Sequence, residues 1–451
     1  MSNKNIERSQ GADDATFPSP RYAWYVVFVL MLCYTFSFVD RQIMAFLVGS
    51  IKQDLQINDT QMGLLGGLAF AVLYTLLGLP MGRLADTRSR RAIIAVGVVF
   101  WSAMTALCSL ARSFSSLFAA RVGVGIGEAT LAPAAFSLIS DYFPKGKMAR
   151  ALSVYAMGIL IGSGMASILG GVVVQAVTHM PPVEVPLLGT LAPWRLTFII
   201  VGVPGIFVAL LLLTVREPVR RNLMRDAAGA VVKVNLGEAV TQIKMRWTSV
   251  LGLSVGMACQ SMCNYGVGFW APAYFARVHG WSPAPAGMVL GLSTIFAGCA
   301  GLFVGGWLCD HWQKQGLREA PVKVGVVGMV CAALPLILAF SVADVRWTVA
   351  LLVPSFFFLG FPIGSTFASV QWIFPNQVRG IASALLVFIL NLGGLSLGSF
   401  LPGYFNNAVF DDETKIGQSL VMTIAIASVI GAAVFRATYA PYRRDHQRLN
   451  P

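Results

Sequence analysis

An arginine and a glutamate stand seven residues apart inside an otherwise apolar segment that runs from about residue 115 to 140. A segment of this length can cross the hydrocarbon core of a membrane as a helix, where each charge costs about 3 kcal/mol on insertion scales. Arg121 and Glu128 project from one helix face, about 10 Å apart along the axis. They read either as an ion pair that fixes helix packing or, more often at this depth, as part of an ion path or substrate site.

A second charged pair, Asp40 and Arg41, lies in the first apolar segment of the chain. Counting helix rise from the ends of the two segments puts this pair level with the stretch between Arg121 and Glu128. A carboxylate in a dry site resists ionising, whereas a neighbouring guanidinium favours the ionised form, and arginine itself stays charged. We therefore predict that Glu128 and Asp40 bind protons. Arg41 and Arg121 are then their charge partners, and one of them holds an acidic head group.

The elements that must position these residues are membrane-spanning helices. The chain is 56% hydrophobic and 12% charged, with a mean hydropathy of +0.70, which excludes an ordinary soluble domain. Its apolar runs are too long for the strands of an outer-membrane barrel. We predict twelve transmembrane helices, near 22–50, 60–81, 92–111, 115–140, 148–177, 194–214, 247–276, 285–309, 322–342, 347–372, 380–405 and 417–437.

The distribution of positive charge predicts the orientation. Most of the 33 Lys and Arg residues fall in the tails and in the loops on one side of the predicted helices. The positive-inside rule then places both termini in the cytoplasm. Topology accounts for the net charge of +13, so a nucleic-acid partner is not expected. We expect a multi-pass protein of a bacterial inner membrane, working as a monomer in the lipid bilayer.

The basic stretch after the sixth predicted helix divides the chain in two. It contains a segment at 236–245 with the pattern of a short amphipathic helix on the membrane surface. The predicted organisation is a cytoplasmic tail at 1–21, a six-helix bundle at 22–215, a cytoplasmic linker at 216–246, a second six-helix bundle at 247–440 and a cytoplasmic tail at 441–451.

Similar loops recur in the two halves. Gly82-Arg-Leu-Ala-Asp86 follows the second predicted helix, and Gly306-Trp-Leu-Cys-Asp310 follows the eighth. A doubled unit with a substrate site between its halves is a recurring transporter design. Over nearly its whole length the chain resembles the major facilitator superfamily, whose loop signature is matched at Gly82, Leu84, Ala85, Asp86, Arg90 and Arg91. The resemblance implies two pseudo-symmetric six-helix bundles and a cytoplasmic gate, formed by Asp86, Arg90 and Asp310, that latches when the carrier faces outward.

Phe38-Val-Asp40-Arg41 and Gly125-Ile-Gly-Glu128-Ala resemble the Spinster-type branch of this superfamily. That resemblance implies a proton-coupled carrier of lysolipids or sphingolipid-like molecules, working by alternating access, with Asp40, Arg41, Arg121 and Glu128 lining its cavity. The organic-anion:cation symporters share similar signatures, so proton-coupled symport of small carboxylates is the alternative.

The second half carries no matching charges. Alignment of the repeated landmarks puts leucines where Arg121 and Glu128 stand. We predict a cavity wall of aromatic and neutral polar residues facing the charges, which suits a solute with a polar head and an apolar tail. The predicted cavity residues are Tyr34, Asn264, Tyr265, Phe357, Phe361, Gln371, Trp372 and Asn391.

No cofactor other than the coupling proton is expected. The four histidines are scattered through loops and tail, and the seven cysteines lie in or at the ends of apolar segments, so a metal site is not predicted. Gly394-Leu-Ser396-Leu-Gly398 fits a hydrolase nucleophile pattern, but no strand precedes it and no histidine is near it in sequence. We therefore do not expect an enzyme.

Overall fold

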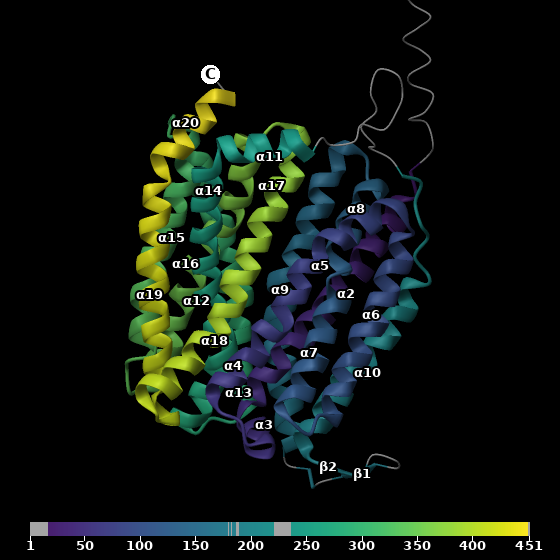
Figure 1. Cartoon of the computed structure of the whole chain (residues 1–451), viewed down its shortest axis with the longest axis vertical. Coiled ribbons are helices and arrows are strands. Elements are labelled where there is room, and N and C mark those ends of the chain that lie inside the picture. Colours follow the sequence, from purple (N-terminus) through teal and green to yellow (C-terminus); the bar gives the residue numbers. More distant parts are fainter. Residues whose placement is uncertain (1–16, 179, 182, 186–188, 221–235, 450–451) are drawn as a thin grey trace, which may run out of the picture.

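The computed structural model describes residues 17–178, 180–181, 183–185, 189–220 and 236–449. Nearly every described element is a helix, and long helices stand side by side along one axis (Figure 1). The amino-terminal helices, residues 20–212, are α2 (Pro20–Phe46), α3 (Val48–Leu55), α4 (Asp59–Gly66), α5 (Leu68–Thr87), α6 (Arg90–Leu107), the 3₁₀ turn η1 (Cys108–Leu110), α7 (Phe114–Glu128), α8 (Leu131–Tyr142), α9 (Lys145–Thr178) and α10 (Pro193–Leu212).

The carboxy-terminal helices, residues 247–449, contain three π-helical segments, η2, η3 and η4. They are α12 (Trp247–His279), α13 (Pro283–Leu292), η2 (Ser293–Gly298), α14 (Cys299–Lys314), α15 (Ala320–Ala339), α16 (Val345–Ile373), α17 (Asn376–Ile389), η3 (Leu390–Leu395), α18 (Ser396–Phe405), η4 (Asn406–Phe410), the 3₁₀ turn η5 (Glu413–Lys415), α19 (Ile416–Ala437) and α20 (Tyr439–Leu449).

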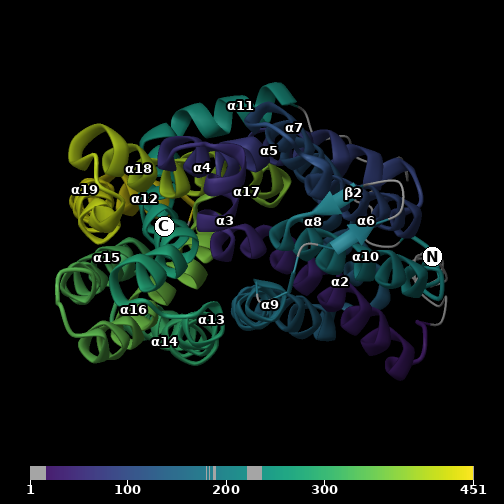
Figure 2. The same cartoon turned by 90° about the horizontal axis from the view of Figure 1, so that it is seen from below.

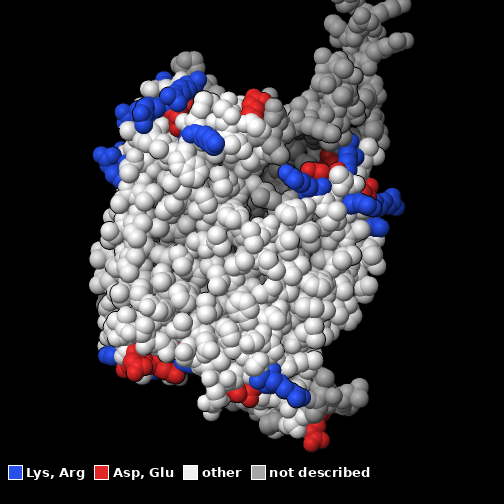
Figure 3. Space-filling model, viewed as in Figure 1, with Lys and Arg blue, Asp and Glu red and all other residues white. Residues whose placement is uncertain are grey.

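Eleven helical segments of the described chain are long and apolar enough to cross a membrane. The twelfth predicted span corresponds to α12, which runs for 33 residues but carries Gln260, Asn264 and several serines along its length. At ~1.5 Å per residue it is as long as its neighbours. Charged side chains on the face shown in Figure 3 gather at the two ends of the molecule and leave a broad uncharged band between them.

Three predicted spans are interrupted in the structure, and one hairpin is added. The span near 22–50 divides at Leu47 into α2 and α3, and the span near 60–81 divides at Gly67 into α4 and α5. The span predicted near 115–140 is two helices, because α7 ends at Glu128 and α8 begins at Leu131, with the Thr130 hydroxyl donating to the Gly127 carbonyl at 2.8 Å. A small antiparallel hairpin of β1 (Val183–Val185) and β2 (Gly189–Leu191) was not predicted. Each strand has three residues, too few for an alternating pattern to be recognised.

The predicted helix before the second half is present as α11 (Leu236–Met245). It lies across the end of the carboxy-terminal helices (Figures 1 and 2). We call this end, where α20 and the start of α2 also lie, the terminal end. The other end, with α3 and the β hairpin, is the distal end (Figure 1). Viewed along the long axis, the amino-terminal and carboxy-terminal helices form two groups side by side (Figure 2).

The two groups of helices meet closely along two seams, α4 against α18 and α9 against α13. Glycine makes both approaches possible. A Cβ atom on Gly403 would lie 2.2 Å from the Asp59 carbonyl oxygen, and one on Gly287 would lie 2.3 Å from that of Ser167. Any larger residue at either position would force the two groups of helices apart at that seam.

Candidate functional site

The four predicted charged residues come together inside the amino-terminal helices. Asp40 and Arg41 project from α2, and Arg121 and Glu128 from α7. Asp40, Arg121 and Glu128 are each at most 2% exposed, whereas the Arg41 side chain keeps 11% of its surface accessible. Asp40 and Arg41 contact Arg121 and Glu128 respectively, which agrees with the prediction that they lie level with the stretch between those two residues.

Arg41 is the direct partner of Glu128. The Arg41 Nε donates to Glu128 Oε2 at 2.6 Å, and a second guanidinium nitrogen, NH2, forms an ion pair with the same oxygen. The Ser37 hydroxyl, one turn earlier on α2, also donates to that oxygen, at 2.5 Å. Ser37 was not singled out from the sequence, although its spacing of four residues from Arg41 puts both on one helix face.

Arg121 makes a different contact. Its NH1 donates to the backbone carbonyl of Asp40 at 3.1 Å. Among the described residues, Asp40 Oδ1, Glu128 Oε1 and Arg121 Nε make no hydrogen bond. Buried polar atoms without partners are rare in proteins and mark places where a proton, water or ligand can bind. The charged site therefore has free donor and acceptor capacity.

Glycines bring the neighbouring helices against this site. A Cβ atom on Gly125 would lie 2.4 Å from the Phe70 carbonyl of α5, and one on Gly127 would lie 2.7 Å from the Trp101 side chain of α6. Small residues around Arg121 and Glu128 therefore permit close helix packing. As a result, α5 places two aromatic rings beside Arg41.

Three aromatic side chains surround the Arg41 guanidinium. Its central carbon lies 4.4 Å from the centre of the Phe70 ring, 4.8 Å from that of Tyr74 and 5.1 Å from that of Phe38. All three distances fall within the range of cation–π interaction. The sequence prediction included neither Phe70 nor Tyr74. Their spacing of four residues on an apolar helix was the available signal.

A narrow cavity of about 70 Å³ lies beside the charged site, between the two groups of helices. Asn264 and Tyr265, both predicted as cavity residues, line it, together with Gln42 and Phe38 on the opposite side. Phe356 also lines it, one position from the predicted Phe357. Aromatic and neutral polar groups of the carboxy-terminal helices therefore do face the amino-terminal helices at this depth.

The other predicted cavity residues do not line this cavity. Tyr34 stacks on Tyr155, with ring centres 5.4 Å apart, within the amino-terminal helices. The rings of Phe357 and Phe361 pack on each other, with centres 5.1 Å apart, and the backbone of both residues lies against glycines of α14. The remaining three lie elsewhere on the carboxy-terminal helices: Gln371 is exposed and donates to Ser383, Trp372 packs in the cluster around Phe361, and Asn391 is buried in η3.

Among the described residues, the three predicted gate residues form no ion pair with one another. Arg90 is fully buried and binds Asp141 and Glu217, with 2.7 Å from its Nε to Glu217 Oε1. Asp86 and Asp310 are exposed, and among the described residues neither belongs to an ion pair. Asp141 lies at the end of α8 and Glu217 lies just after α10. Both are far from the loop in sequence, so the loop signature alone could not predict that they bind Arg90.

Glu217 lies outside the membrane-spanning segments. Burial raises the pKa of Glu217, but the Arg91 backbone N–H and the Arg90 and Ser89 side chains outweigh that effect, so its pKa lies below the usual value. Ser89 also caps α6 by accepting from the Ala92 backbone N–H. Ser89 therefore both binds Glu217 and caps the helix that carries Arg90.

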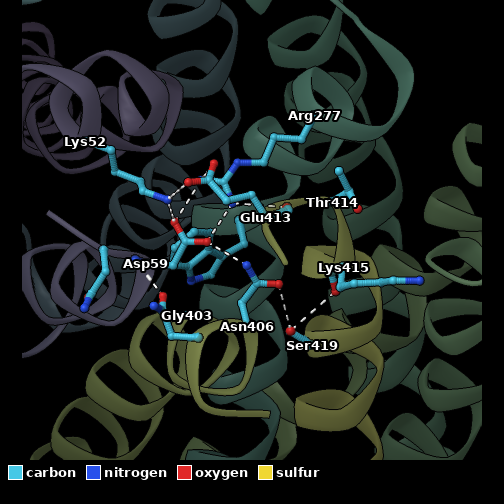
Figure 4. Close-up of polar contacts among 12 residues, drawn as sticks. Lys52, Asp59, Arg277, Gly403, Asn406, Glu413, Thr414, Lys415 and Ser419 are labelled. Carbon is cyan, nitrogen blue, oxygen red and sulfur yellow. Dashed lines mark hydrogen bonds and ion pairs between the residues drawn. The ribbon is translucent and has the colours of Figure 1, made fainter. Parts of the chain in front are cut away.

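The distal end carries a charged network that the sequence did not predict (Figure 4). Asp59, which is 1% exposed, accepts two hydrogen bonds from Arg277, at 2.7 and 2.8 Å, and one from Asn406 at 2.7 Å. Lys52 binds Asp59 and also Glu413, both at 2.6 Å. Arg277, Asn406 and Glu413 belong to the carboxy-terminal helices, so the network ties the two groups of helices together.

Comparison with known proteins agrees with this architecture. Residues 30–399 match the Major Facilitator Superfamily. An "MFS-type efflux pump" of Mycolicibacterium smegmatis is 32% identical over 96% of this chain and 96% of its own. "Protein spinster homolog 1" of Xenopus tropicalis is 25% identical over 95% of this chain and 83% of its own. "Probable galactarate/D-glucarate transporter GudP" of Bacillus subtilis is 24% identical over 85% and 86%.

Among solved structures, the chain is similar to a bacterial homologue of the human lysosomal transporter Spinster, crystallised in an inward-facing, unoccupied conformation. The identity is 26%, the TM-score is 0.77, and the match covers 96% of this chain and 98% of the other. The family match spans most of the chain, and the shared fold extends over both groups of helices. This multi-pass membrane protein therefore belongs to the Major Facilitator Superfamily and is a transporter of the Spinster type.

Proposed function

We propose that the protein is a proton-coupled secondary transporter that moves a lysolipid-like or other amphipathic anion by alternating access. The observation that carries the proposal is the buried Glu128–Arg41 pair, which lies beside the cavity between the two groups of helices. Protonation of Glu128 releases Arg41 from its charged partner. The guanidinium then holds the anionic head group of the substrate, and the apolar tail lies along the aromatic side chains of the second half.

Asp40 is the second proton-binding group in this scheme, with Arg121 as its charge partner. Arg121 already holds the Asp40 backbone, so the two groups stay together while the helices move. The organisation that we propose is two six-helix bundles, at 22–215 and 247–440, joined by the linker at 216–246, with both termini in the cytoplasm. In that orientation the distal network closes the outer end, and the protein faces inward.

The function requires nothing bound other than substrate and protons, and we propose that a single chain carries it out in the inner membrane of a bacterium. Arg90 packs the cytoplasmic end of the amino-terminal bundle in the inward-facing state. Asp86 and Asp310 would contact the opposite bundle only when the cytoplasmic end closes.

Symport of a small carboxylate is the second candidate. It is favoured by the similarity to the Bacillus subtilis protein named for galactarate and D-glucarate. Such a substrate would use Arg41 and Arg121 together and leave the aromatic wall without a role. The melting temperature of detergent-solubilised protein separates the two candidates, because a ligand that binds the folded state raises it. Lysolipids should raise it, whereas galactarate should not. The reverse result would favour the carboxylate symporter.

The main test is uptake into proteoliposomes across an imposed pH gradient. Glu128→Gln should lower gradient-driven uptake at least ~100-fold, because the glutamine cannot release a proton, while exchange of substrate across the membrane is partly retained. Glu184→Gln is the matched control, since Glu184 is an exposed acid of the β hairpin. Wild-type pH dependence in Glu128→Gln would rule out Glu128 as the coupling group.

A further inference from the structure

The aromatic side chains around Arg41 have a specific geometry. Phe70 and Tyr74 are four residues apart on α5, and their rings stack with centres 5.0 Å apart and planes 26° apart. With Phe38 of α2 they cover the guanidinium from several directions. We call Phe38, Phe70 and Tyr74 the aromatic clasp. Phe70 is 1% exposed, so it meets Arg41 away from water.

Among the described residues, Glu128 is the acceptor of every hydrogen bond that the Arg41 side chain donates. When Glu128 is neutral, a guanidinium with 11% of its surface exposed loses its anionic partner and still carries a full charge. A buried charge without a partner costs several kcal/mol, so the side chain would tend to leave for water. The faces of aromatic rings attract a cation without needing to be ionised.

We infer that Phe70 and Tyr74 are positioning residues that keep Arg41 in place when Glu128 takes up a proton. This inference rests on the proposed proton-coupled function and assigns a role to α5 in it. The clasp holds the guanidinium at the cavity, ready for an anionic head group, and returns it to Glu128 once the proton leaves. Without the clasp, Arg41 would have to find Glu128 again from many conformations.

The other charged and titratable groups around this pair do not replace the clasp. On α2, Asp40 lies next to Arg41 but has its backbone bound by Arg121 of α7. Tyr34 of α2, Tyr74 of α5 and Tyr265 of α12 are also within electrostatic range of Arg41. A hydroxyl oxygen can accept a hydrogen bond from a guanidinium. It does not supply the electrostatic attraction that an anion or the face of an aromatic ring gives to a cation.

Ring electrostatics can be changed with almost no change in shape. Phenylalanine carrying one, two or three ring fluorines, introduced at position 70, weakens cation–π attraction stepwise. We expect gradient-driven uptake to fall in the same order, by roughly two- to tenfold in total, the factor for ~0.5–1.4 kcal/mol. Tyr74→Leu, which removes the second ring of α5, should lower uptake by a similar factor.

The chain contains a matched control. Phe400 and Tyr404 on α18 have the same spacing, and their rings also stack with planes 26° apart, but no cation–π contact is described for either ring. Fluorination of Phe400 should leave uptake unchanged. Equal uptake for every fluorinated form at position 70, or equal losses at positions 70 and 400, would overturn the inference.

A second measurement separates failure of the clasp from failure of the proposed function. Fluorination at position 70 should lower the melting temperature of detergent-solubilised protein clearly in the wild-type background and much less in Arg41→Gln, where only Arg121, 5.9 Å from the centre of the Phe70 ring, remains as a cation. This result supports the clasp even if the wild type shows no proton-driven uptake, which would refute only the proposed function. The same lowering in both backgrounds would overturn the clasp, because fluorine would then be affecting packing alone.

Discussion

The two ends of the molecule are held together in different ways. At the distal end, the ion pairs Asp59–Arg277 and Lys52–Glu413 connect the amino-terminal helices to the carboxy-terminal helices (Figure 4). At the terminal end, Arg90 binds acids that follow α7 along the same half of the chain, and Arg443 of α20 binds Glu319 just before α15. Within the described residues, these terminal pairs stiffen each group of helices separately.

This difference indicates which end must open during transport. Ion pairs that join the two groups must break when they separate, whereas pairs inside one group can survive the movement as a unit. The distal network therefore acts as a latch, because its ion pairs must break before the two groups of helices can separate at that end. The terminal pairs are internal braces, because each joins residues of one group of helices.

The largest expected effect comes from breaking the latch. Asp59→Asn leaves Lys52 and Arg277 without their shared, buried anion, and removing one partner of such a network costs about 3–5 kcal/mol. The ratio of outward- to inward-facing molecules should then rise by more than about a hundredfold. Spin labels on the exposed Gln53 and Thr414, in the two groups of helices, should report a longer distance in the variant.

Glu184→Gln, at the same end but in the β hairpin, is the control for the latch. It should leave the distance between the two labels unchanged. If Asp59→Asn also leaves that distance at its wild-type value, the network is a local stabilising feature. The contrast between the two ends would then carry no information about gating.

The sequence predicted which residues meet at the central site better than it predicted the ion pairs at either end. Arg41, Arg121, Asp40 and Glu128 were identifiable because a charge in a long apolar segment is conspicuous, and helix rise gives its depth. Which base pairs with which acid was harder to predict from the sequence. It depends on how α2 is rotated about its axis relative to α7, and this rotation brings Arg41, and not Arg121, to Glu128.

The latch and the braces escaped prediction for a physical reason. Asp59, Arg277 and Asn406 lie at the ends of helices, where charged residues are common and solvation is the ordinary expectation. Nothing in their spacing shows that three distant segments converge on one carboxylate. The aromatic wall was predicted with Phe357 where Phe356 faces the cavity, because one residue turns a helix by about 100°.

A medium effect is expected from weakening a brace. Arg90→Lys replaces a fork that binds Asp141, Glu217 and the Pro218 carbonyl by a single ammonium group. The melting temperature should fall by several degrees, for a loss of about 1.5–3 kcal/mol, with no change in the distance between labels at the distal end.

Arg443→Lys is the comparison. Its side chain is 53% exposed, so less than about 1 kcal/mol should be lost. A change in the distal distance for Arg90→Lys would show that this brace also controls the gate.

The smallest expected effect is the acid dependence of the Arg90 brace. The pKa of Glu217 is lowered in the folded protein, because the Arg91 backbone N–H, Arg90 and Ser89 outweigh the effect of burial. The unfolded chain has the ordinary value near 4.3. The stabilisation is therefore complete above that value and is lost as the pH falls through the folded pKa. The melting temperature of Glu217→Gln should lie below that of the wild type at neutral pH, and the gap should narrow as the pH falls below about 4.3. Glu184→Gln should differ from the wild type by the same small amount at every pH. A gap for Glu217→Gln that stays constant over this range would mean that its charge does not stabilise the brace, and that the two ends differ in packing alone.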